Sequence, residues 1–256
     1  MNLNRAIYKL RMKYNSNRDV LWRAFISLLP IFILLFFIVL KFKFRNIYVQ
    51  IVGMDDSIIE DLQVVFYFIA AILALLITKS FLNVKYYLIA LIYCILFLGF
   101  LFICLEEISW GQRIFNIQYP TSIIANNYQE ECNLHNLNII EPYIYKIYIG
   151  ASAFCAFAWL IIPVRRRTKL FSMSVYIIPD KMLILYFLPT FAIFLYFDYM
   201  GIYSFGLNTT GFIHVRDQEV VELLLSLGFL FFMMLSRYRQ IRQLNFECGT
   251  ISKKLV

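Results

Sequence analysis

The chain contains 256 residues, of which 61% are apolar and 16% are charged. A soluble domain is about half apolar and about a quarter charged, so this composition excludes an ordinary soluble protein. The net charge of +8 would suggest a nucleic-acid partner in a soluble chain. Here basic segments beside apolar runs explain the charge, and the sequence contains no nucleic-acid-binding module. The five cysteines form no CxxC pair, so neither a zinc ribbon nor a redox pair is indicated.

Several apolar runs are long enough to cross a bilayer core as helices, which takes about 20 residues. We therefore predict an all-α polytopic membrane protein that forms one integral membrane domain over residues 1–256. A basic tail over 1–23 leads into the first span, and an ordered outer cap over 106–142 follows the third. Pro30 and Pro189 fall inside spans and predict kinks. The six predicted spans are about 21–40, 62–78, 86–105, 143–163, 182–197 and 219–235.

The basic residues are distributed unevenly between the two sides of the predicted bundle. With the N-terminus inside, the inside segments hold eighteen of the twenty-four Lys and Arg. The positive-inside rule then predicts that both termini are cytoplasmic. Thirteen of the sixteen Asp and Glu fall in or beside the outside loops, as do both histidines. Nearly all side chains capable of catalysis or metal binding are therefore predicted to gather on the outer face.

The stretch Glu-Glu-Ile-Ser-Trp-Gly-Gln-Arg, residues 106–113, directly follows the third apolar run. Carboxylates at the end of a span are costly against lipid, so Glu106 and Glu107 indicate a functional site. If the helix continues through this stretch, Glu106, Trp110 and Arg113 share one face, and Glu107 points about 100° away. The alternative is an interfacial helix end with a belt tryptophan and an internal Glu–Arg pair.

A second polar cluster, residues 126–136, lies between the third and fourth spans. On a helix, Glu131 and His135 would be an i, i+4 pair able to share a proton or a metal ion. Asn133 and Asn136 would hydrogen-bond a ligand or fix the tautomer of the imidazole. A solvated turn with a structural histidine is the alternative.

A third polar cluster, residues 214–222, opens the last span. In helical geometry His214 and Asp217 lie on one face, with Glu222 at its edge. Acids in a first turn suit the helix dipole, which is the structural explanation of Asp217 and Glu219. Glu222 is harder to explain in this way, because the run that follows it is apolar and long enough to be membrane-embedded.

The octapeptide, followed about 20 residues later by Asn-Leu-His-Asn, resembles an uncharacterised family of bacterial multipass membrane proteins. The resemblance covers residues 106–136 and implies a bacterial inner-membrane protein, without implying an activity. The paired glutamates are also similar to those of membrane CAAX-type proteases. In that family the arginine follows the glutamates more closely and helices carry histidine motifs that are missing here, so we reject this match. The implied family signature consists of Glu106, Glu107, Trp110, Gln112, Arg113, Asn133, His135 and Asn136.

The polar clusters support three hypotheses of function. The first is a hydrolase or transferase at the outer membrane boundary that acts on a lipid or lipid-linked substrate, with a glutamate as general base. Its catalytic residues would be Glu106, Glu107, Arg113, His135, His214 and Asp217. The residues that would contact the substrate are Trp110, Gln112, Glu131, Asn133 and Asn136. If a divalent metal ion binds, its ligands would be His135, His214 and Glu106.

The second hypothesis is a small-solute carrier, which should place charges deep within several spans, yet only Lys146 and Glu222 are predicted there. The third is a non-catalytic scaffold or assembly subunit, in which the polar clusters only join helices.

We also predict that the clusters converge at the outer ends of the third and sixth spans. One of the paired glutamates should then lie within roughly 8 Å of one of the two histidines.

Overall fold

The computed structural model is a bundle of helices, without strands in the residues that it describes, which confirms the predicted fold class. Six helices are long and apolar enough to cross a membrane, and each coincides with a predicted span, so the chain is a multipass membrane protein. These segments are Val20–Lys43, Ile58–Asn83, Tyr87–Glu107, Glu141–Ile161, Ser174–Met200 and Gln218–Arg242. The described residues are 17–53, 57–115, 127, 133–135, 137, 139–161, 174–201 and 215–252.

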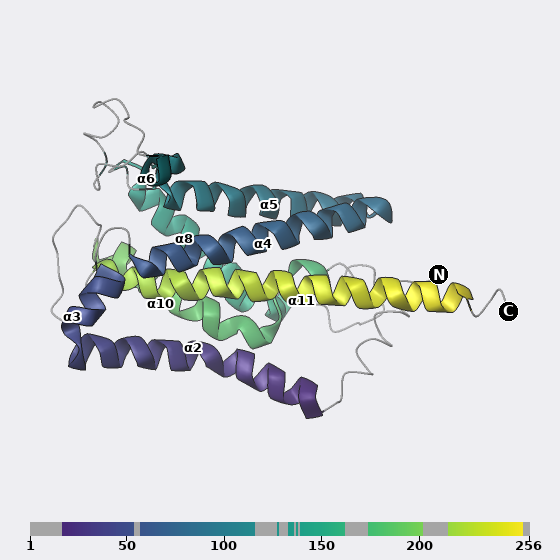
Figure 1. The fold of residues 1–256 in the computed structure, drawn as a ribbon, viewed down its shortest axis with the longest axis horizontal. Helices are drawn as coiled ribbons and strands as arrows, with labels where there is room; N and C mark the ends of the chain where they lie inside the picture. Colours follow the sequence, from purple (N-terminus) through teal and green to yellow (C-terminus); the bar gives the residue numbers. More distant parts are fainter. Residues whose placement is uncertain are drawn as a thin grey trace.

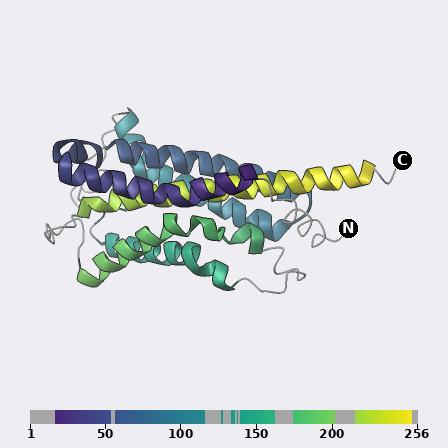
Figure 2. The same cartoon turned by 90° about the horizontal axis from the view of Figure 1, so that it is seen from below.

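The last helix, α11 (Gln218–Ser252), lies in the middle of the bundle (Figure 1). On one side α4 (Ile58–Asn83) packs against it, and α5 (Tyr87–Glu107) packs against α4. On another side α10 (Ile184–Met200) packs against α11, and α8 (Glu141–Phe157) packs against α10. Figure 2 shows α8 and α10 as a separate pair alongside the other helices.

The central position of α11 agrees with its burial. In the most apolar stretch of its span 72% of the residues are buried, against 22% for the span in α2 (Asn17–Lys43). The small residues Ala70, Ala71 and Ala74 of α4 are also buried, and small side chains let membrane helices approach one another closely. α2 contacts α10 and α11 but exposes most of its apolar side chains, as expected of a helix that faces lipid.

The connection between the first two spans is partly helical. Helix α3 (Arg45–Tyr48) follows α2, and a π-helical turn, Val49–Gly53, follows α3. Helix α4 then begins with a capping box. The Ser57 hydroxyl accepts a hydrogen bond from the Glu60 N–H at 3.3 Å, and the Glu60 carboxylate accepts one from the Ser57 N–H at 3.2 Å. This reciprocal pair fixes where the second span starts, although both side chains are buried.

Near the other end of the α11 span, Arg239 fixes the segment that precedes α10. Its guanidinium donates to the Asp180 carboxylate at 2.8 Å and to the Val175 carbonyl at 2.7 Å. Asp180 also caps the 3₁₀ turn η4 (Lys181–Leu183) by accepting a hydrogen bond from the Met182 N–H at 3.3 Å. These contacts hold α10 and α11 together at the end of the bundle opposite the polar clusters.

Gly228 lies where α11 closely approaches α10. A β-carbon there would lie 2.8 Å from the Tyr186 β-carbon and 3.1 Å from the Phe187 ring. Gly228→Ala is therefore expected to lower the stability by about 1–3 kcal/mol, as overpacking does, in thermal unfolding in detergent. Gly150→Ala on α8 is the matched control, because nothing lies within 4 Å of its added methyl group. Equal stability of the two variants would contradict this packing.

Candidate functional site

Helix α5 ends at Glu107, and the chain passes through a 3₁₀ turn, η2 (Ser109–Gly111), into the short helix α6 (Gln112–Phe115). Three consecutive residues of the turn have left-handed backbone, with φ values of 47° at Ser109, 52° at Trp110 and 87° at Gly111. This conformation costs a residue with a β-carbon about 1–2 kcal/mol. It persists only where surrounding contacts hold it in place.

The helix does not continue through the octapeptide, so the condition for a common helical face of Glu106, Trp110 and Arg113 is not met. Glu106 and Trp110 nevertheless meet, because the turn carries the indole back over the end of α5. The indole N–H donates to Glu106 Oε1 at 2.6 Å, and the ring packs edge-on against Phe102 with centroids 5.8 Å apart. The side chain of Arg113 lies outside the described residues, as does any pairing with a glutamate.

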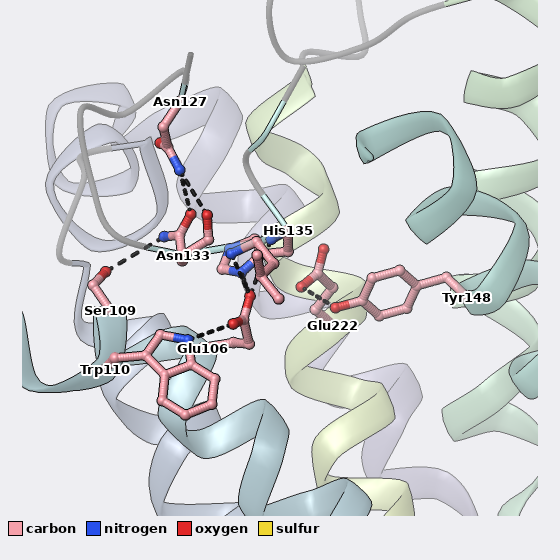
Figure 3. A network of polar contacts seen from close by, with 9 residues as sticks. Glu106, Ser109, Trp110, Asn127, Asn133, His135, Tyr148 and Glu222 are labelled. Carbon is pink, nitrogen blue, oxygen red and sulfur yellow. Dashed lines mark hydrogen bonds and ion pairs between the residues drawn. The ribbon is translucent and has the colours of Figure 1, made fainter. Parts of the chain in front are cut away.

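The carboxylate of Glu106 joins α5 to the loop that precedes α8. Its Oε2 accepts hydrogen bonds from the backbone N–H groups of Leu134 at 2.7 Å and His135 at 3.0 Å, while Oε1 holds Trp110 (Figure 3). Glu106 is only 4% exposed, and a buried charge without partners costs several kcal/mol. Glu106 and its donors therefore stabilise one another.

His135 lies in a turn, and Glu131, its predicted helical partner, lies outside the described residues. Its Nδ1 lies 3.4 Å from Glu106 Oε2, which confirms the predicted approach of a glutamate to a histidine. Burial alone would lower the pKa of His135, but the contact with Glu106 and the charges of Glu107 and Glu219 raise the pKa above its ordinary value. Within the described part of the chain, Nε2 has no hydrogen-bond partner.

Two asparagines fix the loop around His135. The Asn133 amide donates to the Ser109 hydroxyl at 3.4 Å. Asn127 donates to the Asn133 carbonyl at 2.9 Å and to its side-chain oxygen at 2.7 Å, and it forms an isolated antiparallel bridge with Leu137. Asn133 was predicted to contact substrate, but here it connects the loop to the turn after α5. Asn127 was not singled out, although it belongs to the same asparagine-rich cluster.

Asp217, predicted as catalytic, contributes to a neighbouring set of contacts. It lies in the 3₁₀ turn η5 (Val215–Asp217) and pairs with Lys41. The Tyr48 hydroxyl donates to it at 2.5 Å. Burial, and then the hydrogen bond to this carboxylate, raise the pKa of Tyr48 above its ordinary value. These contacts attach the start of the last span to α2 and α3.

The buried acids that follow on α11 face the interior of the bundle. The Gln63 amide donates to Glu219 Oε2 at 3.1 Å and to the Glu219 carbonyl at 3.2 Å. Arg216 Nη1 lies 3.5 Å from Glu60 Oε1 and 3.9 Å from Glu219 Oε1. The sequence analysis missed Gln63, although it is the only amide in the apolar run of the second predicted span.

One turn further along α11, Glu222 accepts a hydrogen bond from the Tyr148 hydroxyl of α8 at 3.0 Å. Glu222 is buried among the helices. Lys146 is exposed on α8, with its ammonium 5.6 Å from the Tyr143 ring centroid. The predicted depth of both residues in the membrane stays a prediction. Figure 3 shows Glu222 pointing at Tyr148 on the side of His135 away from Trp110.

The three predicted clusters therefore come together in part. Charges of Glu107 and Glu219 act on His135, and α5 touches α11 through Phe100 and Phe229, whose ring centroids are 5.3 Å apart. α4 is nevertheless the main neighbour of both helices. Gln112 is half-buried at the start of α6. The predicted site residues outside the described part are His214, Glu131 and Asn136.

The predicted metal site needs His214, so it cannot be assembled from the described residues. Among those residues, no group of three or more His, Cys, Asp and Glu side chains could hold a metal ion. Glu106 and His135, the other two predicted ligands, contact each other directly. Their arrangement resembles the carboxylate–imidazole pairs that orient a histidine for proton transfer.

Comparisons of the chain with family models, curated proteins and solved structures find no match. The resemblance of the octapeptide and the Asn-Leu-His-Asn motif to a bacterial membrane family stays a prediction.

Proposed function

We propose that this protein is a membrane-embedded hydrolase or transferase that acts on a lipid or lipid-linked substrate. The observation that carries the proposal is the contact between Glu106 and His135, with Nδ1 and Oε2 3.4 Å apart. A carboxylate beside one ring nitrogen fixes the ring and its tautomer, and it stabilises the protonated form. The other ring nitrogen, Nε2, is then left to exchange a proton with a substrate.

In this mechanism His135 is the proton-transfer residue and Glu106 is a positioning residue. The sequence predicts Glu106 or Glu107 as general base, but the oxygens of Glu106 already accept hydrogen bonds from two backbone N–H groups and an indole. Burial opposes the charged ring, but the contact with Glu106 outweighs it and raises the pKa of His135 above its ordinary value. The ring therefore holds a proton more readily, as a proton-transfer residue must. Glu107, whose charge reaches His135, would stabilise the imidazolium.

The position of the Glu106–His135 pair, called the dyad below, favours a substrate that reaches it from the membrane. Glu106 lies in the last turn of a span, and His135 follows it into the cap. The side chain of Trp110 covers Glu106 while remaining partly exposed, and tryptophan is enriched at the membrane–water interface. Lipid head groups occupy that interface, so a lipid or lipid-linked substrate would present its reacting group beside His135.

The proposal places the protein in a bacterial inner membrane with both termini cytoplasmic. This orientation rests on the excess of Lys and Arg in the predicted inside segments. A membrane-impermeant thiol reagent added to intact cells should then label Cys132 and spare Cys248. Permeabilised cells provide the control, in which both should react. Labelling of Cys248 in intact cells would overturn the orientation and would place the dyad on the cytoplasmic side.

A scaffold is the second candidate, and the hydrogen bonds of Glu106 favour it. A carboxylate that binds two backbone N–H groups and an indole is also a way to join a helix to a loop without any chemistry. The two candidates differ in what they require of His135. A scaffold needs only its backbone N–H, whereas an enzyme needs the imidazole.

The test of the enzyme is a comparison of extracted lipids by mass spectrometry. Cells that lack the protein should accumulate a lipid or lipid-linked species that cells with the wild-type chain convert. The purified protein in detergent should convert the same species. If no lipid or lipid-linked species differs between the two strains, and none is converted in detergent, the enzyme proposal fails and the scaffold is favoured.

A further inference from the structure

Glu222 is a carboxylate that is buried between helices, and its hydrogen-bond partner is a neutral side chain. It is 7% exposed, and its one described hydrogen bond comes from the Tyr148 hydroxyl at 3.0 Å. No Lys, Arg or His of the described residues forms an ion pair with it. The charges of Glu219 and Glu107 act on Glu222 and repel its own. A buried carboxylate in this position needs a proton or a cation from elsewhere.

A second observation, on a different helix, indicates whether a proton or a cationic ligand compensates the charge of Glu222. Gln63 of α4 is fully buried, and both hydrogen bonds of its amide nitrogen go to Glu219. Its side-chain oxygen has no hydrogen-bond partner among the described residues. Buried acceptors without a partner are rare in native structures, and each one needs an explanation such as a missing ligand. A lone proton on Glu222 would not satisfy this oxygen, whereas a ligand with several N–H donors could.

An aromatic side chain also lies beside Glu222. The Tyr148 hydroxyl donates to its carboxylate at 3.0 Å, and the charge of Glu222 acts on Tyr67. Tyr148 is held in place by stacking on Phe194, with ring centroids 4.4 Å apart and planes at 6°. A carboxylate and a tyrosine hydroxyl oxygen can both accept hydrogen bonds from an organic ammonium group. A metal ion fits less well, since the described residues offer no group of three or more His, Cys, Asp and Glu that could hold one.

We propose that Glu222, Gln63 and Tyr148 bind the ammonium group of an amine-bearing ligand at the outer end of the bundle. Where that ligand is identified with the substrate, the proposal rests on the proposed function. Figure 3 shows Glu222 on one side of His135. An ammonium head group bound at Glu222 would place the remainder of an aminolipid near the imidazole. The binding of the amine itself requires no catalysis and is tested without it.

The test measures lipid binding to the full-length protein in detergent, in the His135→Gln background so that turnover is too slow to affect the measurement. The probes are two short-chain phospholipids with identical acyl chains, one with an ethanolamine and one with a glycerol head group. The ethanolamine lipid should bind about tenfold more tightly or better, since only it supplies an ammonium. Methylammonium chloride should displace it, and sodium chloride at the same ionic strength should not.

Two variants locate the site. Glu222→Gln should weaken binding of the ethanolamine lipid by about 30-fold, and Gln63→Leu by about tenfold. Asp61→Asn is the matched control, because it removes the same charge from an exposed position of α4 and should change nothing. Equal binding of the two lipids, or unchanged binding in Glu222→Gln, would overturn the proposal. A proton on Glu222 would then explain how its carboxyl group is buried. If the protein binds the amine selectively but the wild-type protein shows no turnover, the proposed enzyme function fails and the amine-binding site stands.

Discussion

Glu106→Ala is expected to lower the free energy of unfolding by about 3–5 kcal/mol, the usual loss when one partner of a buried charged network is removed. The variant leaves the N–H groups of Leu134 and His135 and the indole of Trp110 without their acceptor. Each buried donor left in this state costs about 1–3 kcal/mol. Thermal unfolding in detergent measures the loss, and limited proteolysis should cut the cap before the spans.

Trp110→Phe provides the graded control for this prediction. It removes one of the three hydrogen bonds to Glu106 and keeps an aromatic ring against Phe102. Its expected loss is about 1 kcal/mol, well below that of Glu106→Ala. If Glu106→Ala were as stable as the wild type, with the same proteolytic pattern, the carboxylate would not be the connection between α5 and the cap.

His135→Gln is expected to lower the turnover of the lipid or lipid-linked substrate by about 10²–10⁴-fold, the usual contribution of a positioned acid or base. The fold should survive, because Glu106 binds the backbone N–H of residue 135 and glutamine keeps that group. Turnover is measured with the species that accumulates in cells lacking the protein. The control is Lys146→Gln, an exposed change on α8 that should leave the rate unaltered. A His135→Gln variant with wild-type turnover and stability would favour the scaffold.

The six spans could be predicted from the sequence because their signal is strong and local. About 20 consecutive apolar residues fit few structures other than a membrane helix, and all six predicted spans coincide with long apolar helices. The burial of Glu222 could be predicted for the same reason, since an acid beside an apolar run stands out. Its partner could not be, because Tyr148 lies on α8 and the pairing depends on how the helices pack.

The turn after α5 could not be predicted from propensities. Only Gly111 signals a left-handed residue, whereas Ser109 and Trp110 adopt positive φ because the tertiary contacts of the turn hold them there. The main partners of Glu106 were missed for a related reason. They are backbone N–H groups of residues 134 and 135, and every residue type except proline supplies such a donor. The distribution of charged residues therefore predicts that a glutamate and a histidine meet, but not that the main chain brings them together.

Asp217 shows that residues close together in the sequence need not belong to the same site. It was grouped with His214 because they are neighbours in sequence, but its carboxylate pairs with Lys41 and Tyr48. Opposite charges on different spans attract whether or not they belong to one site, and a single sequence does not indicate which pairs form. By contrast, Gln63 could have been singled out, since an amide within an apolar run must find partners inside the bundle.

Nitrogen-15 NMR of histidine-labelled protein shows whether Glu106 orients His135 for proton transfer. The chain has two histidines, and the signal missing from His135→Gln identifies His135. The pKa of His135 should lie above the ordinary value of about 6.5, because the carboxylate favours the protonated ring. In Glu106→Gln the pKa should fall, since that charge is gone. A wild-type pKa at or below the ordinary value, or one unchanged in Glu106→Gln, would contradict the account.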